Sequence, residues 1–177
     1  MSSTFDPGTA LTIQLENDAK DLAEARYQLD PHEHRRVPLH ITLIYPFVRR
    51  RDLTSDVLSG LRAFFGARAS PAFDLARVEE FPGEIAYVAP EPDRPLIELI
   101  HELSDAYPET PPYGGRFEHT VPHVTIAGLD VADIGSVRSR VAPLLPVRCH
   151  PDRASLVEEY EPDRWREWHA LPFAGAA

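Results

Sequence analysis

Most of the chain consists of short segments in which hydrophobic residues either alternate with polar ones or recur at helical spacing. Alternation predicts strands with one buried face, and a spacing of three to four residues predicts amphipathic helices. Proline and glycine separate the segments, as at Pro82-Gly83, where a hairpin turn is expected. The expected strands are 10–15, 39–45, 73–81, 84–89, 121–127, 154–160 and 165–171, and the expected helices are 17–29, 54–67, 96–107 and 131–145.

Local signals refine the ends of these elements. Asn17 is the expected N-cap of the first helix, and Pro31 is expected to end it. The segment 108–115 combines proline and glycine and is expected to be a loop. The sequence therefore predicts alternating short strands and helices of an α+β protein, with no linker rich in glycine or serine between its halves.

Two sequence patterns recur along the chain. Val78-Glu79-Glu80-Phe81 returns as Val157-Glu158-Glu159-Tyr160, 79 residues later. Leu39-His40-Ile41-Thr42-Leu43 returns as Pro122-His123-Val124-Thr125-Ile126, 83 residues later. Two matches in the same order at nearly the same offset favour an internal duplication, and coincidence among common strand residues is the alternative. We expect one domain over residues 1–177, made of two pseudo-symmetric lobes.

The charge balance limits the partners of the protein. The chain has 18 Lys and Arg against 28 Asp and Glu, a formal net charge of −10. This excess opposes broad adhesion to long nucleic acids or to anionic membranes, but it allows a small anionic ligand in a local positive pocket. The longest basic run, Arg49-Arg50-Arg51, is expected to be a solvated turn. We expect no extended nucleic-acid surface and no membrane partner.

Cysteine content and the N-terminal sequence narrow the class further. Cys149 is the only cysteine, so the sequence offers no disulfide pair or cysteine-based zinc framework, and we expect it to be buried in a strand. The stretch 1–6 lacks the features of a secretory signal, and no apolar run approaches the ~18 residues that span a bilayer. We expect a cytoplasmic protein, acting as a monomer.

The repeated pentapeptides place candidate chemistry on two strands. Because side chains alternate along a strand, Leu39, Ile41 and Leu43 can enter the core while His40 and Thr42 point together to the other side.

In the second copy, His123 and Thr125 have the same relation to the hydrophobic Val124 and Ile126. A pseudo-two-fold axis would bring the two His/Thr pairs together across one cleft. One imidazole could then act as base and the other as acid, while two hydroxyls donate to phosphate oxygens. The alternative is an ordinary polar sheet face.

These duplicated tetrapeptides resemble the paired signature of the 2H phosphoesterase superfamily, in particular its bacterial 2′-5′ RNA ligase and cyclic phosphodiesterase branch. The motifs are His40-Ile41-Thr42-Leu43 and His123-Val124-Thr125-Ile126. The resemblance implies two antiparallel sheets flanked by helices around a central cleft. It also implies His40 and His123 as the acid and base, Thr42 and Thr125 as phosphate ligands, and no metal or other cofactor.

Further residues are candidates for substrate contacts. Tyr113 lies between two prolines and two glycines, where little can bury it, so it is a candidate base or ribose contact. Arg116 precedes the second motif and could place a cation beside the phosphate, as could Arg35 and Arg36 before the first; surface charge is the alternative for each. Core packing is the default expectation for Tyr45 and Trp168.

One other cluster could indicate a different chemistry. His32-Glu33-His34 presents alternating metal ligands, but it follows a proline in an expected solvated loop, and we predict no metal there. The function expected is a metal-independent phosphodiesterase that opens 2′,3′-cyclic phosphates or 2′-5′ phosphodiesters of nucleotides or short RNA ends, with reversible ligation as a related reaction. The alternatives are a non-catalytic nucleotide-binding module on the same fold and, less favoured, a metal-dependent hydrolase using His32 and His34.

Overall fold

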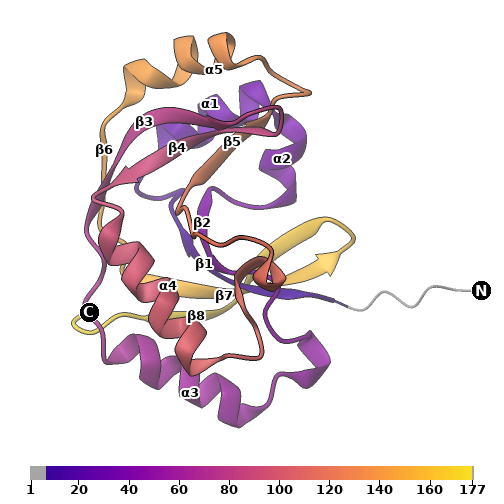
Figure 1. Ribbon diagram of the computed structural model, residues 1–177, viewed down its shortest axis with the longest axis vertical. Coiled ribbons are helices and arrows are strands. Elements are labelled where there is room, and N and C mark those ends of the chain that lie inside the picture. The colour runs from indigo at the N-terminus through magenta and orange to yellow at the C-terminus, as the bar shows by residue number, and fades with distance from the viewer. Residues whose placement is uncertain (1–6, 177) are drawn as a thin grey trace, which may run out of the picture.

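Two four-stranded antiparallel sheets form the framework of the protein in a computed structural model that describes residues 7–176 (Figure 1). All seven predicted strands are present, and the predicted α+β class with two antiparallel sheets is confirmed. The first sheet has the order β2 (His40–Ile44), β1 (Thr9–Gln14), β7 (Arg153–Glu161), β8 (Arg164–Pro172). The second has the order β5 (Val124–Gly128), β4 (Ile85–Glu91), β3 (Phe73–Phe81), β6 (Val147–Cys149).

The two sheets do not correspond to the two halves of the sequence. The first sheet combines the first two strands of the chain with the last two, and the second sheet takes the four strands between them. Strands β2 and β5, which carry the repeated pentapeptides, occupy the same edge position in their respective sheets and contact each other. Strands β3 and β7, which carry the other repeat, both occupy the third position.

Five α-helices among residues 7–176 cover the sheets. Helices α1 (Lys20–Leu29), α2 (Pro31–Arg36) and α5 (Ile134–Val141) pack on the second sheet, at the top of Figure 1. Helices α3 (Ser55–Gly66) and α4 (Arg94–Ala106) pack against β8 and β2 of the first sheet. Short 3₁₀ turns lie at Arg50–Asp52, Pro112–Gly115 and Ala142–Leu144. No helix among residues 7–176 has the length and apolar character that crossing a membrane requires.

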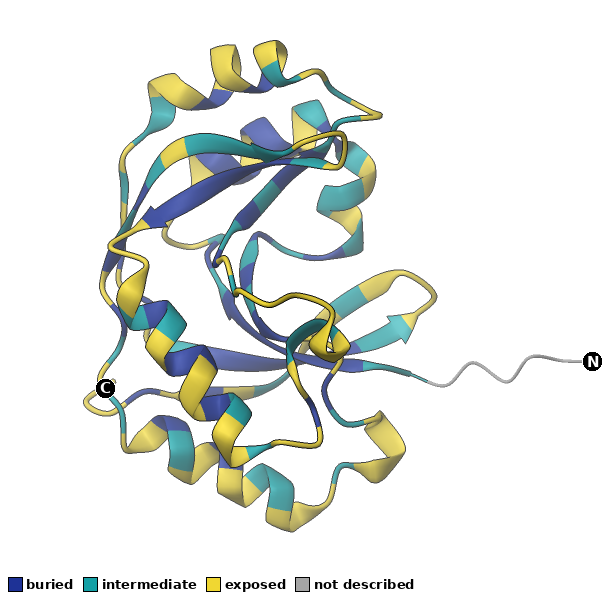
Figure 2. Ribbon diagram, in the orientation of Figure 1, coloured by how far each residue is buried: buried dark blue, intermediate teal, exposed yellow. Residues whose placement is uncertain are grey.

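The core follows the predicted alternation. Ile41 and Leu43 of β2, with Val124 and Ile126 of β5, are at most 1% exposed. The buried positions concentrate on the strands and on the helix faces turned toward them, while the outer helix faces and loops are exposed (Figure 2). Cys149 is fully buried in β6, as expected. Burial of one face of β2 and β5 fixes the direction of the polar side chains on the other face.

Several local expectations were wrong. Ala19, rather than Asn17, occupies the N-cap of α1, and it makes no side-chain capping bond. Pro31 does not only end a helix but also begins one, because proline suits the first turn, where its missing N–H leaves no bond unmade. The Asp30 side chain caps this new helix by accepting a hydrogen bond from the Glu33 N–H at 3.0 Å.

The expected loop at His32-Glu33-His34 is therefore the short helix α2. The helix expected over 131–145 is also shorter, because Asp133 caps its start at Ile134 and a separate 3₁₀ turn follows Val141. Strand β6 was not among the strands predicted by range, although Cys149 was expected to lie in a strand. It is only three residues long and depends on pairing with β3, a contact between segments far apart in sequence.

Candidate active site

The four side chains of the duplicated motifs come together in one pocket of about 200 Å³, here called the histidine pocket. His40 and Thr42 reach it from β2, and Thr125 reaches it from β5. His123 lies one residue before β5 begins. The contact between the two edge strands thus joins pairs that are 83 residues apart in sequence.

The two imidazoles are held in the same way. The Nδ1 atom of His40 lies 2.7 Å from the carbonyl oxygen of Pro38, and the Nδ1 atom of His123 lies 2.7 Å from that of Val121. A carbonyl only accepts, so each Nδ1 carries the proton of this bond. Nε2 remains as the ring nitrogen that can accept a proton from a ligand or, when the ring is charged, donate one.

The local charges make the two histidines unequal. Burial and the positive charge of Arg26 lower the pKa of His40 from 6.5 to about 4; the hydrogen bond to the Pro38 carbonyl opposes this change, and His123 and Arg36 add smaller decreases. Burial also lowers the pKa of His123, and its hydrogen bond to the Val121 carbonyl opposes that change. Both rings therefore favour the neutral form, His40 through nearby cations as well as burial.

A third hydroxyl in the pocket was not anticipated from the sequence. Thr12 lies beside Thr42 in the β1–β2 ladder and lines the histidine pocket. It is 2% exposed, and its Oγ1 has no hydrogen-bond partner among the described residues. Leaving a buried hydroxyl unpaired is unfavourable, so this atom is suited to a ligand in the pocket. The sequence did hold a signal for the direction of the Thr12 side chain. Because side chains alternate along β1, Leu11 and Ile13 are buried on one face and Thr12 points to the other.

Helix α2 supplies the charged wall of the pocket. Glu33 and Arg36 both line it, and Arg36 is held by Glu33 at 3.5 Å and by Asp163 at 3.3 Å. Beneath them, the fully buried Arg26 donates to the Val37 carbonyl at 2.7 Å and pairs with Glu33 at 3.3 Å. The two guanidinium groups are thus balanced by the carboxylates of Glu33 and Asp163, and Arg36 is the cation that lines the pocket itself.

The predicted contact Tyr113 lies at the histidine pocket, in the 3₁₀ turn after α4. Its N–H donates to the Tyr45 carbonyl at 2.6 Å, and its phenol forms a hydrogen bond with Thr42. Tyr113, Gly114 and Gly115 all have positive φ, which the two glycines adopt without strain. Burial raises the pKa of the Tyr113 phenol, while the Thr42 bond opposes this shift.

The other aromatic and basic candidates are distributed differently. Tyr45 is 42% exposed and lines the histidine pocket beside Trp165, so the expectation that it packs in the core was wrong. Trp168 does pack against the core. Arg116 lines a neighbouring cavity rather than the histidine pocket. Because α2 is a helix, His32 and His34 project about 200° apart, which does not favour a shared metal ion.

Comparison with known proteins identifies the family of the chain. The family model described as the 2′-5′ RNA ligase superfamily matches residues 14–163, most of the chain. The chain belongs to the 2′-5′ RNA ligase superfamily. The resemblance to 2H phosphoesterases drawn from the two motifs is thereby confirmed, and membership supports a phosphoesterase-type enzyme. A comparison with curated proteins gave no significant match.

Solved structures share the fold of this superfamily member over nearly its whole length. A phosphoesterase crystal structure aligns with a TM-score of 0.64 and 15% identity, over 96% of this chain and 99% of that chain. The crystal structure of Escherichia coli LigT complexed with 3′-AMP aligns with a TM-score of 0.59 and 16% sequence identity, over 96% of this chain and 99% of that chain. The crystal structure of TT0787 of Thermus thermophilus aligns with a TM-score of 0.59 and 18% sequence identity, over 96% of this chain and 100% of that chain. At these identities the likeness establishes the fold alone.

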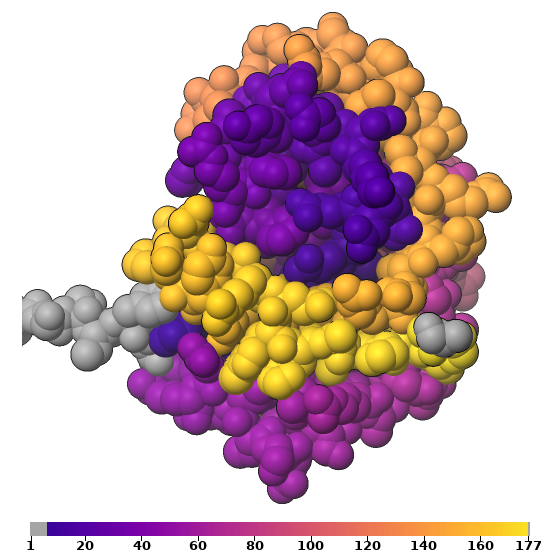
Figure 3. All heavy atoms as spheres, turned by 180° about the vertical axis from the view of Figure 1, so that it is seen from behind, coloured from indigo at the N-terminus to yellow at the C-terminus, as the bar shows by residue number. Residues whose placement is uncertain are grey.

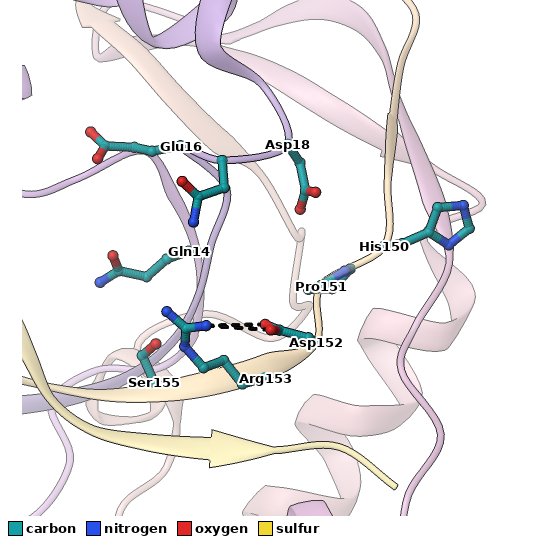
Figure 4. Close-up of a pocket in the computed structure, with 9 residues that line it drawn as sticks. Gln14, Glu16, Asp18, His150, Pro151, Asp152, Arg153 and Ser155 are labelled. Atoms are coloured by element: carbon teal, nitrogen blue, oxygen red, sulfur yellow. Dashed lines mark hydrogen bonds and ion pairs between the residues drawn. The ribbon is translucent and has the colours of Figure 1, made fainter. Parts of the chain in front are cut away.

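The superfamily member has another hollow, on the face shown in Figure 3, where the indigo N-terminal segment borders the orange and yellow C-terminal segments. This rear hollow has a volume of about 280 Å³. Glu16, Asp18 and Asp152 line it, and its Arg153 is paired with Asp152 at 3.3 Å (Figure 4). Burial, and then the charge of Asp152, raise the pKa of Asp18. An anionic ligand is disfavoured here, so the histidine pocket is the better site for a phosphate.

Proposed function

We propose that the protein is a phosphodiesterase that opens 2′,3′-cyclic phosphates, or 2′-5′ phosphodiesters, of nucleotides and short RNA ends by acid/base catalysis with His40 and His123. The observation that carries this proposal is the matched anchoring of the two imidazoles in one pocket. Each Nδ1 is engaged by a carbonyl at 2.7 Å, and two threonine hydroxyls lie in the same pocket. In this mechanism one Nε2 accepts a proton from water while the other donates to the departing oxygen.

Thr42 and Thr125 have the role of donors to the non-bridging phosphate oxygens. Thr12 adds a third donor, since its buried hydroxyl is otherwise unpaired among the described residues. Arg36 supplies a guanidinium donor at the wall of the pocket, and Tyr113 orients Thr42 through their hydrogen bond. Hydroxyl and guanidinium groups fixed around a phosphate stabilise charge that develops in the transition state. None of these roles requires a metal ion.

Relatives of the same fold support a nucleotide substrate. Escherichia coli LigT has been crystallised with 3′-AMP, ATP, NADP⁺ and phosphate. We carry from these only the class of ligand, a small molecule with a phosphate and a nucleoside. Run in reverse, the same proton transfers would join ends, so 2′-5′ ligation is the related activity to test.

We also infer that residues 1–177 form a single domain that arose by duplication. The two repeated pentapeptides occupy equivalent edge strands, and the second pair of repeats occupies equivalent third strands. A duplication accounts for both placements with one event.

The deciding experiment is turnover of a substrate panel. The panel contains 2′,3′-cyclic mononucleotides, ADP-ribose cyclic phosphate and 2′-5′ dinucleotides, and phosphorus NMR identifies the position of the product phosphate. Hydrolysis to a phosphomonoester supports the enzyme. Tight binding of these compounds without turnover would instead identify a nucleotide-binding module, the second candidate retained from the sequence.

A further inference from the structure

Arg36 brings a guanidinium group to the lining of the histidine pocket, and two carboxylates hold it there. The Nη1 atom of Arg36 lies 3.5 Å from a carboxylate oxygen of Glu33, and its Nε lies 3.3 Å from one of Asp163. A phosphate seeks the same N–H donors, because guanidinium groups bind phosphate through charge-assisted hydrogen bonds. Phosphate binding beside both carboxylates would gather three anionic groups around one cation, so a bound phosphate favours the release of one carboxylate.

Glu33 is poorly placed to leave Arg36. Its side chain is 17% exposed, and its other carboxylate oxygen pairs with Arg26 at 3.3 Å. Arg26 is fully buried, and its Nε already has no hydrogen-bond partner among the described residues. Withdrawing the carboxylate from Arg26 would leave a buried charge without compensation, which is strongly unfavourable. Glu33 therefore stays between the two arginines.

Asp163 has the opposite surroundings. It lies at the tip of the hairpin that joins β7 to β8, outside the lining of the histidine pocket, and its side chain is 67% exposed. Arg36 is itself 42% exposed. An ion pair between exposed side chains contributes little to stability, because water solvates both groups when they separate. Asp163 is therefore the carboxylate that can be displaced at low cost.

The ion pair of Arg36 and Asp163 joins two layers of the fold beside the histidine pocket. Helix α2 packs on the second sheet, the hairpin belongs to the first, and its yellow tip lies below α2 in Figure 1. Trp165, two residues after Asp163, lines the histidine pocket. The hairpin thus contributes a ring to the pocket and a carboxylate to the cation in its wall.

We infer that Asp163 is an internal competitor for the substrate phosphate: it pairs with Arg36 in the free protein, and the phosphate takes its place when substrate binds. This inference rests on the proposed function, which places a phosphate in the histidine pocket. The exchange replaces one ion pair by another and changes no covalent bond. It lowers the affinity of the pocket for any phosphate, that of the product included, and so favours release of the product.

The first experiment compares two carboxylates of the same hairpin by calorimetric titration with inorganic phosphate. Asp163→Asn removes the competitor, and asparagine tolerates the backbone φ of 60° found at this position. Its affinity for phosphate should rise by about two- to fivefold, the range that corresponds to the usual strength of an exposed ion pair. Glu161→Gln is the matched control, because it makes the same change in net charge but its partner is Arg164, at 3.3 Å. Its phosphate affinity should stay that of the wild type.

Two results of this titration would overturn the exchange. Unchanged affinity in Asp163→Asn would show that the carboxylate does not compete with phosphate. Weaker binding would show that Asp163 instead positions Arg36 for the phosphate, so that both remain together in the complex. An equal rise in Glu161→Gln would show a general effect of net charge.

The second experiment asks whether the effect passes through Arg36. Arg36→Gln should by itself weaken phosphate binding, and adding Asp163→Asn to it should change the affinity no further, since the competition has lost its object. The same gain from Asp163→Asn in both backgrounds would contradict the exchange, because Asp163 would then act on the phosphate directly.

Turnover of 2′,3′-cyclic AMP by the wild-type protein separates the exchange from the function on which it rests. Wild-type turnover together with unchanged phosphate affinity in Asp163→Asn would overturn the exchange alone. A wild-type protein that neither turns over the cyclic nucleotide nor binds phosphate would overturn the proposed function, and the exchange with it.

Discussion

His40 and His123 make the same hydrogen bond at the start of two edge strands: each ring Nδ1 lies 2.7 Å from the carbonyl oxygen of the residue two positions before it. The repeated geometry fixes which nitrogen of each ring is available to a substrate. The surroundings of the rings then differ, since Arg26 and Arg36 act on His40. The two rings thus share one backbone contact and differ in the charges around them.

Removing either imidazole should reduce turnover without unfolding the protein. His40→Ala and His123→Ala are each expected to lower kcat/KM on 2′,3′-cyclic AMP by ~10²–10⁴-fold, the contribution of a positioned acid or base. The double variant should be scarcely slower than the slower single one, because the pair acts as a unit. Circular dichroism checks the fold, and His150→Ala, in the rear hollow, is the control that should keep full activity. Full activity in either folded single variant contradicts the two-histidine mechanism.

The pH profile of kcat/KM should be bell-shaped, with its maximum on the acid side of neutrality. One imidazole must be neutral and the other protonated for the two proton transfers. Burial lowers the pKa of both rings, that of His40 to about 4, so activity should be lost as pH falls through that region and should decline again as pH rises and the second ring loses its proton. A kcat/KM profile from pH 3 to 9 checks this, with both limbs belonging to the coupled pair. An optimum above pH 8 would contradict it.

Thr12→Val should separate stability from phosphate binding. Valine keeps the shape of threonine but removes the unpaired buried hydroxyl, so the free energy of unfolding should rise by about 1 kcal/mol. Affinity for inorganic phosphate should fall, because a donor is lost from the histidine pocket.

Thr9→Val is the matched control on the same strand. The buried Thr9 hydroxyl donates to the Val48 carbonyl, so this variant should lose stability and leave phosphate affinity unchanged. Urea denaturation and calorimetric titration with phosphate measure both quantities. A loss of stability in Thr12→Val without a change in affinity would show that Thr12 has only a structural role.

Substrate length and salt should have little effect on KM. The basic run cannot form a free phosphate track, because Arg50 is paired with the buried Glu158 at 3.0 Å. A protein that releases counterions from Z phosphates of a single strand shows a salt slope of about −0.7Z, and a single-phosphate site has a shallow one. We therefore expect similar KM values for a cyclic mononucleotide and for a 10-mer with the same cyclic end. A much lower KM for the 10-mer with a steep salt slope would identify RNA as the partner.

Chelation should leave activity unchanged. The proposed proton transfers and phosphate contacts use side chains alone, so dialysis against EDTA is expected to preserve kcat on 2′,3′-cyclic AMP. Added zinc or manganese should give no increase. A requirement for either ion would favour the metal-dependent alternative, for which His32 and His34 were the sequence candidates.

The sequence by itself determined where seven of the strands lie and which residues form the two motifs, while the arrangement in two sheets was what the family resemblance implied. Alternation in β2 assigned Ile41 to the core and His40 with Thr42 to the opposite face, because a strand has only two faces and burial selects one. The same reasoning placed Thr125 opposite the buried Val124 and Ile126, while His123 lies just before the strand begins. Alternation within a strand depends only on near neighbours in the sequence, so it can be read without the fold.

Only the tertiary structure decided what surrounds those residues. Thr12 becomes a pocket residue because β1 pairs with β2, and Arg36 enters the wall because α2 packs beside β5. Tyr113 reaches Thr42 because the loop after α4 returns to the end of β2, through a backbone bond to Tyr45. The depressed pKa of His40 depends on burial and on Arg26, a residue in another element. Contacts between distant segments and the desolvation they cause have no local pattern, so the environment of the site emerges only when the chain is folded.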